Sequence, residues 1–120
     1  MIRDYKDLIV WQKSMDLAEE IYRLVKLLPK EETYALSDQM RRAAISVPSN
    51  IAEGYQRNTD KDLRHFLCIA KGSVAELETQ VLLCTRLKYI PEGAANNVQL
   101  LTEEVAKMLS AFISRLNADS

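Results

Sequence analysis

Four stretches of the sequence carry apolar residues at the alternating three- and four-residue spacing that is typical of one face of an α-helix. They run from Leu8 to Leu28, from about Thr33 or Tyr34 to Glu53, from Thr59 to Cys84, and from Ala95 to Leu116. Only three glycines and three prolines occur among the 120 residues, and the connections are short. We therefore predict an all-α fold, an antiparallel up-down-up-down four-helix bundle, formed by residues 1–120 as a single domain.

The first predicted helix carries two apolar stripes where one would suffice for a bundle core. One stripe consists of Leu8, Trp11, Met15, Ala18, Tyr22 and Val25. The other consists of Leu17, Ile21, Leu24 and Leu28. The helix is either sunk deeply in its own bundle or presents the extra stripe to another subunit, and the sequence leaves both interpretations open.

The second helix contains the stretch QMRRAAISVPSNIAEG, Gln39–Gly54, with a proline inside the helical pattern. Pro48 cannot donate a hydrogen bond to the carbonyl of Ala44 and crowds it. Because the apolar spacing resumes at Ile51, we predict a continuous helix that is kinked at Pro48. Gly54 is predicted to be the residue just past the end of this helix, where glycine is favoured.

The third helix has a recognisable start and an unusual interior. Thr59 and Asp62 form a variant of the capping box, so the helix is predicted to begin there. Gly72 interrupts the apolar pattern, although glycine inside a helix costs about 1 kcal/mol relative to alanine. We therefore predict that a neighbouring helix approaches closely at Gly72.

Composition narrows the classes of protein further. Hydrophobic residues make up 48% of the chain, and 16 basic residues nearly balance 17 acidic ones, for a net charge of −1. This balance argues against a surface devoted entirely to nucleic acid. No apolar run reaches the roughly 18 residues of a membrane span, and the first residues lack the apolar core of a signal peptide, so a cytoplasmic protein without a membrane partner is expected.

The two cysteines are predicted to be reduced. Cys68 and Cys84 fall on one helix, and at ~1.5 Å rise per residue they lie ~24 Å apart, too far for a disulfide. Both are expected to be buried as small apolar side chains.

Polar residues of the second and third helices are predicted to face one another. A register centred on the loop at 55–59 places Arg41 opposite Ser73 and Arg42 within a turn of Glu76. The arginine pair could bind phosphate, but an ion pair with Glu76 or Glu78 is the favoured interpretation. Side chains near Pro48 are expected to satisfy freed backbone groups rather than bind a ligand. The predicted structural polar network comprises Arg41, Arg42, Ser49, Asn50, Glu53, Ser73, Glu76 and Glu78.

A second basic cluster lies at the turn between these two helices. Lys61 and Arg64 share a helix face, but Asp60 and Asp62 are interleaved with them, which favours a mixed solvated surface over a nucleic-acid site. The candidate contacts to nucleic acid are Arg41, Arg42, Arg57, Lys61 and Arg64.

The sequence favours no catalytic, metal or cofactor site. There is a single histidine, His65, and neither the paired motifs of a di-iron bundle nor the cysteine spacing of a zinc site occurs. His65 and Cys68 could share a helix face, but no third group that would orient a catalytic pair is evident. No phosphate-binding glycine loop is present. We therefore expect a protein that is not an enzyme, without a cofactor or metal.

Several stretches together resemble a known family. The segments LIVWQKSMDLAEEIYRL, QMRRAAISVPSNIAEG, FLCIAKGSVAELETQ and LKYIPEG occur in this order and cover nearly the whole chain. They are similar to the four-helix-bundle family of 23S rRNA intervening-sequence proteins, whose genes can lie within inserts in large-subunit ribosomal RNA genes. The resemblance implies a small bundle that assembles into a homopentameric ring. A related branch, the accessory proteins of diversity-generating retroelements, binds nucleic acid through a strongly basic surface, from which the near-neutral charge of this chain departs.

Two hypotheses about function follow. The leading one is a non-enzymatic bundle that assembles with itself and acts as an interaction scaffold, because one helix is doubly apolar and no catalytic constellation is present. The alternative is an RNA- or DNA-binding accessory protein, in which a modest basic patch is repeated around a homo-oligomer and gains affinity by avidity.

Overall fold

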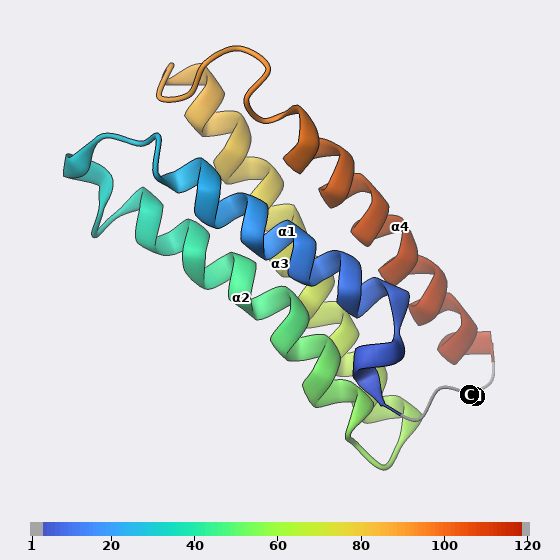
Figure 1. The fold of residues 1–120 in the computed structure, drawn as a ribbon. Coiled ribbons are helices and arrows are strands. Elements are labelled where there is room, and N and C mark those ends of the chain that lie inside the picture. The colour runs from blue at the N-terminus through green and yellow to red at the C-terminus, as the bar shows by residue number, and fades with distance from the viewer. Residues whose placement is uncertain (1–3, 119–120) are drawn as a thin grey trace.

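The protein is an elongated bundle of four long helices (Figure 1), seen in a computed structural model that describes residues 4–118. It measures 45 × 24 × 21 Å along its principal axes. The elements in chain order are the 3-10 turn η1 (Tyr5–Asp7), α1 (Ile9–Val25), the 3-10 turn η2 (Lys30–Glu32), α2 (Leu36–Tyr55), α3 (Asp60–Arg86) and α4 (Asn96–Ala118). The predicted all-α four-helix bundle is confirmed.

Each helix packs against two neighbours, so that the bundle is square in cross-section. α1 contacts α2 and α4, and α3 contacts α2 and α4. η1, the α2–α3 turn and the end of α4 lie at one end of the bundle, and the other two connections lie at the opposite end (Figure 1). Sides of the square are therefore formed by α1–α2, α2–α3, α3–α4 and α4–α1.

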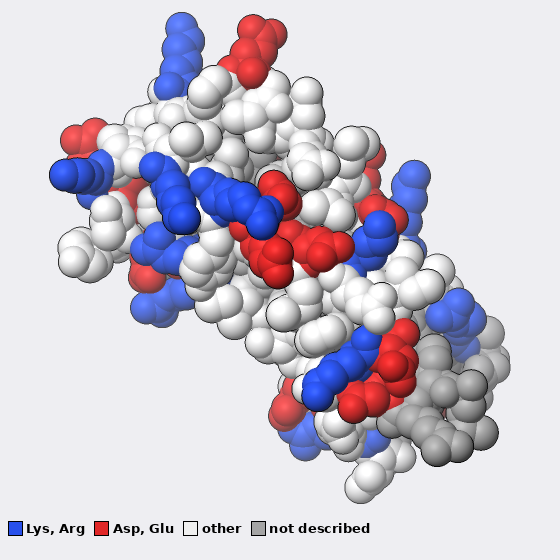
Figure 2. Space-filling view, in the orientation of Figure 1, with Lys and Arg blue, Asp and Glu red and all other residues white. Residues whose placement is uncertain are grey.

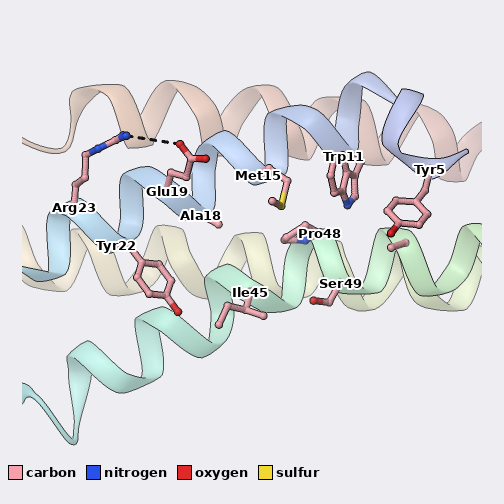
Figure 3. Close-up of a pocket in the computed structure, with 11 residues that line it drawn as sticks. Tyr5, Trp11, Met15, Ala18, Glu19, Tyr22, Arg23, Ile45, Pro48 and Ser49 are labelled. Atoms are coloured by element: carbon pink, nitrogen blue, oxygen red, sulfur yellow. Dashed lines mark ion pairs between the residues drawn. The ribbon is translucent and has the colours of Figure 1, made fainter.

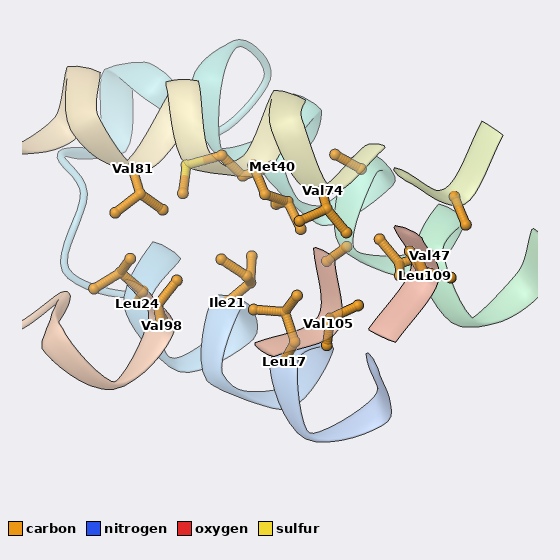
Figure 4. Packing of buried hydrophobic residues seen from close by; sticks show 14 of the residues in the cluster. Leu17, Ile21, Leu24, Met40, Val47, Val74, Val81, Val98, Val105 and Leu109 are labelled. Carbon is orange, nitrogen blue, oxygen red and sulfur yellow. The ribbon is translucent and has the colours of Figure 1, made fainter. Parts of the chain in front are cut away.

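The core runs along the bundle axis and draws on all four helices (Figure 4). The apolar stripe of α1 that contains Leu17 and Ile21 is completely buried there. Val47 of α2, Val74 of α3 and Val105 of α4 meet it with no exposed surface. Burial of apolar area at about 25 cal/mol per Å² is the main stabilising contribution of such a core.

The start of α3 agrees with the predicted signal, whereas α1 ends at Val25, three residues before the predicted end at Leu28, and the start of α2 also differs. Thr59 caps α3 as predicted, since its hydroxyl accepts a hydrogen bond from the Asp62 backbone nitrogen at 3.1 Å. α2 begins at Leu36 rather than at Thr33 or Tyr34, because Thr33 closes η2. Tyr89, just beyond α3, donates a hydrogen bond to a Glu32 carboxylate oxygen at 2.8 Å, which ties two connections together and raises the pKa of Tyr89.

α2 is continuous through Pro48, as predicted. Figure 3 shows the axis of α2 changing direction near Pro48, which agrees with the predicted kink. Proline removes one backbone hydrogen bond and pushes the preceding turn aside, so the helix bends there without ending.

The two helical glycines have the opposite roles to those predicted. Gly54 lies inside α2, and in the described part of the chain Gly93 is the only glycine with positive φ, so Gly54 is not the residue past the helix end. A Cβ added at Gly54 would lie 2.8 Å from the Cβ of Phe66, so the close approach to α3 occurs here. Gly72 has no atom of another residue within 4 Å of the corresponding position, and the predicted close approach there is wrong for this chain alone.

We expect Gly54→Ala to destabilise the protein by about 1–3 kcal/mol, the usual cost of overpacking, because Phe66 must move to admit the methyl group. Gly72→Ala is the matched control and should be neutral or stabilising by up to about 1 kcal/mol, because it adds helix propensity in open space. Urea denaturation followed by circular dichroism measures both. Equal effects of the two substitutions would contradict the assignment of the close contact to Gly54.

Candidate functional site

An apolar groove lies on the surface between α1 and α2 (Figure 3). It has a volume of about 720 Å³ and is open to solvent along its length. The residues that line it are Tyr5, Trp11, Met15, Ala18, Glu19, Tyr22, Arg23, Ile45, Pro48, Ser49 and Ala52. We call this feature the α1–α2 groove.

The doubled stripe of the first helix produces this groove. The stripe of Leu17 and Ile21 is buried in the core, whereas Met15 and Tyr22 of the other stripe remain about 40% exposed (38% and 39%). Trp11 is half-buried and packs edge-on against Tyr5, with ring centroids 5.4 Å apart. Leu8 and Val25, at the two ends of the extra stripe, are buried in the core, whereas Met15 and Tyr22 between them line an open surface.

α2 supplies the facing wall of the groove. Ile45 is 49% exposed and lies beside Pro48 (Figure 3). Ser49 and Ala52 continue this wall toward the end of α2. The apolar spacing did not predict a role for Ile45, because this residue falls outside the apolar stripe of α2. The signal that could have found it is a large apolar residue outside that stripe and three positions before Pro48.

The rim of the groove carries charged side chains that are partly paired. Arg23 forms ion pairs with Glu19, at 3.7 Å, and with Glu20. One turn before Ile45, the Arg41 guanidinium donates a hydrogen bond from Nη2 to the backbone oxygen of Thr33 at 3.2 Å. Arg41 thus lies at the α1–α2 loop end of the groove, and within residues 4–118 it bonds to this backbone carbonyl and to no carboxylate.

The arginine pair does not bind the glutamates of α3 that the sequence predicted. Arg42 forms its ion pair with Asp38, one turn earlier in α2, at 3.1 Å from Nε to Oδ2. Glu76 and Glu78 are exposed, and neither forms an ion pair within residues 4–118. An acidic partner four residues away on the same helix is always within reach, so it competes well with one on another helix.

The register between α2 and α3 also differs from the predicted one. Ser73 bonds to Ser46 and not to Arg41. The register centred on the loop would place Cys68 opposite Ser46, so the observed partner lies five residues further along the chain. Gly54, in the last turn of α2, contacts Leu63 and Phe66 in the second turn of α3. The first turn of α3 therefore extends past the end of α2 before the helices meet.

A small hydrogen-bond network joins the two helices at this level. The hydroxyl of Ser73, which is buried, donates to Oγ of Ser46 at 2.8 Å, and Nδ2 of Asn50 contacts the same oxygen at 2.9 Å. Asn50 also donates to the backbone oxygen of Ser46 at 2.8 Å, on the helical turn that contains Pro48. Asn50 therefore bonds to the backbone near the kink, but at Ser46 and not at the Ala44 carbonyl that Pro48 frees. The predicted network did not include Ser46, which bonds to both Ser73 and Asn50. Ser49, which was included, lines the groove instead.

The basic cluster at the α2–α3 turn is mixed with acidic groups. Arg57 pairs with Glu53 at 2.6 Å and stacks over the ring of Phe66, 4.8 Å from its centroid. Lys61 is exposed and Arg64 is half-buried, and neither forms an ion pair within the described residues. On the face drawn in Figure 2, basic and acidic side chains are likewise interspersed among uncharged ones.

The two cysteines differ in their exposure to solvent. Cys84 is buried against Met40, and burial raises the pKa of its thiol. Cys68 is exposed, so its predicted burial is wrong: it lies on the outward face of α3, away from the core stripe.

Within residues 4–118, no group of three or more His, Cys, Asp and Glu side chains could hold a metal ion. None of the helices described is long and apolar enough to cross a membrane.

Comparison with known proteins identifies the family of this chain. The sequence profile of the 23S rRNA-intervening sequence protein family matches residues 6–111. The chain belongs to this family. Among solved structures, this chain is similar to a protein of unknown function from the S23 ribosomal protein family of Bacteroides thetaiotaomicron, with 29% sequence identity and a TM-score of 0.81. The alignment covers 88% of this chain and 98% of that one. No curated protein matches the chain. These comparisons confirm the family predicted from the sequence, indicate no catalytic family and assign no molecular role.

The serine network makes a prediction about stability. Ser46→Ala leaves the buried hydroxyl of Ser73 without its acceptor, which should cost about 1–3 kcal/mol. The double substitution with Ser73→Ala removes both partners and should cost less than the sum of the two single changes. Ser49→Ala, on the exposed side of the same helix, should stay within about 0.5 kcal/mol of the parent. Urea denaturation at one fixed protein concentration tests all four proteins, and strictly additive costs would show that the hydroxyls do not interact.

Proposed function

We propose that this family member is a non-enzymatic helical bundle that assembles with itself and acts as an interaction scaffold. The observation that supports the proposal is the α1–α2 groove, an apolar surface that lies outside the core of the bundle. Trp11 packs against the core with part of its surface, but Met15 and Tyr22 leave much of theirs in the open groove, where a partner would bury it.

The composition of the groove suits contact with another protein. Aromatic residues and methionine are enriched where proteins meet, and a contiguous exposed apolar patch on a soluble chain commonly marks an interaction site. Trp11 and Tyr22 supply large rigid contact areas, Met15 adapts to a partner's shape, and the paired charges of Glu19 and Arg23 form a polar rim. This arrangement of anchors and rim is typical of an interface.

The expected assembly is a homopentamer, following the resemblance to family members that form five-membered rings. Each chain has a mass of 13.7 kDa, so a ring of five is readily distinguished from a monomer. A second copy of the chain is the simplest occupant of the groove, because it is available at every concentration at which the protein exists.

Sedimentation velocity at micromolar concentration should show a species several times heavier than the 13.7 kDa chain. Met15→Lys, which places a charge in the groove, should shift this species toward monomer. Leu100→Lys makes the same change on an exposed site of α4, outside the groove, and should leave the mass unchanged. A wild-type protein that sediments as a stable monomer would refute the proposal.

Binding of RNA or DNA is the second candidate function, and Lys61 and Arg64 favour it because they form no ion pair in the described part of the chain. A ring would repeat this pair in every subunit and raise affinity by avidity. Gel shifts with structured RNA should then show binding that weakens steeply with salt and is reduced in Lys61→Ala/Arg64→Ala. Absence of binding at low salt would exclude this candidate.

A further inference from the structure

A second apolar surface lies on the outward face of α3. Ile69, Leu83 and Leu87 are 39%, 44% and 47% exposed, and they are spaced so that they follow one side of the helix together with Gly72 and Glu76. The position of a Cβ on Gly72 is open, with nothing within 4 Å. We call these five residues the α3 ridge.

The ridge lies on the side of α3 that adjoins α2. Ser73 points from α3 to α2, where it bonds to Ser46. Ile69 precedes Ser73 by four residues and Glu76 follows it by three, so both lie along the same side of the helix, further outward. The groove is on the α1–α2 side of the square bundle, and the ridge is next to it, roughly a quarter-turn away around the bundle.

The groove and the ridge also match in height along the bundle. The bond between Ser46 and Ser73 sets these two residues at one level, and α2 and α3 run in opposite directions. Residues that follow Ser73 therefore lie level with residues that precede Ser46. Glu76 comes to about the level of Arg41 and Arg42, and Ile69 to about the level of Pro48 and Ala52, the centre of the groove.

The charges at matching heights are opposite. Glu76 is exposed and forms no ion pair with any other described residue. At this level of α2, the hydrogen bond of Arg41 among the described residues goes to a backbone oxygen, so no carboxylate there neutralises its charge. Lys26, at the end of α1, is exposed and adds positive charge, whereas Arg23 is paired with Glu19 and Glu20. Guanidinium and carboxylate groups that are too far apart within one chain can meet between two chains.

We propose that the α3 ridge of one copy docks into the α1–α2 groove of the next, with Glu76 facing Arg41 across the interface. This inference rests on the proposed self-assembly and specifies its two surfaces. Ile69 then enters the apolar centre of the groove, and Gly72 gives the two backbones room to approach. Because the contacting surfaces differ and lie at an angle on each copy, successive copies turn about an axis along the bundle and close a ring.

Two variants test the pairing because each damages only one surface. Gly72→Trp fills open space in the single chain and should fold, but it obstructs the ridge. Ile45→Glu places a charge on an exposed residue of the groove. Each variant alone should sediment as a monomer, with the far-ultraviolet circular dichroism of the parent. Ser114→Trp, on the exposed surface of α4, is the matched control and should assemble normally.

An equimolar mixture of the two variants is the decisive experiment. The intact groove of Gly72→Trp should accept the intact ridge of Ile45→Glu, so the mixture should form a one-to-one heterodimer and nothing larger. If the groove instead pairs with a second groove, Gly72→Trp forms a homodimer by itself while Ile45→Glu stays monomeric, and the inference is wrong. If wild type assembles and Gly72→Trp assembles equally well, the ridge is not involved, although self-assembly stands. A monomeric wild type would remove the proposed function itself.

A charge exchange provides an independent test of the contact between Arg41 and Glu76. Arg41→Glu and Glu76→Arg should each weaken assembly by about tenfold or more, and the double variant should recover most of the loss. Arg42→Glu with Glu76→Arg is the control, since Arg42 is already paired with Asp38 and recovery should be smaller. Equal recovery in both double variants, or none in either, would overturn the assignment of Arg41.

Discussion

α1 carries more apolar surface than one side of a four-helix core can bury, and the rest of the structure depends on this excess. A helix in such a bundle buries a stripe, and Leu17 and Ile21 supply it here. The adjacent stripe, with Trp11, Met15 and Tyr22, then has only α2 beside it. Since α2 bends at Pro48, the two helices leave an open groove rather than a closed seam.

α2 contacts the core with one face and lines the α1–α2 groove with the other. Its inner face is set by Gly54, which admits the backbone of α3, and by the Ser46 hydroxyl, which fixes the level of Ser73. Its outer face presents Ile45 to the groove and Arg41 to the groove end. One kinked helix thus fixes the height of α3 and forms one wall of the proposed interface, which explains why so many small and polar residues are concentrated in Gln39–Gly54.

The fold could be predicted from the sequence because apolar spacing and short loops dictate a bundle almost by themselves. Only one wall of the candidate site could be predicted from the sequence. The extra apolar stripe of α1 was evident from its spacing, but Ile45 and Ser46 were not, because neither belongs to the apolar stripe of α2. The predicted pairing of Arg42 with Glu76 failed because Asp38, one turn earlier on the same helix, supplies the carboxylate. The predicted register of α2 and α3 was wrong for a separate reason, because the close contact at Gly54, and not the loop length, sets it. Sequence spacing within one helix is fixed by geometry, whereas the offset between helices depends on packing.

Trp11 offers the most direct test of the claim that the groove is covered by assembly, because it is the only tryptophan in the chain and lies in the groove wall. Its emission maximum should be recorded during dilution, in parallel with the sedimenting mass. The account predicts a shift to longer wavelength over the same concentration range in which the mass falls, as water reaches the half-buried ring. A fall in mass with no change in Trp11 emission would contradict it.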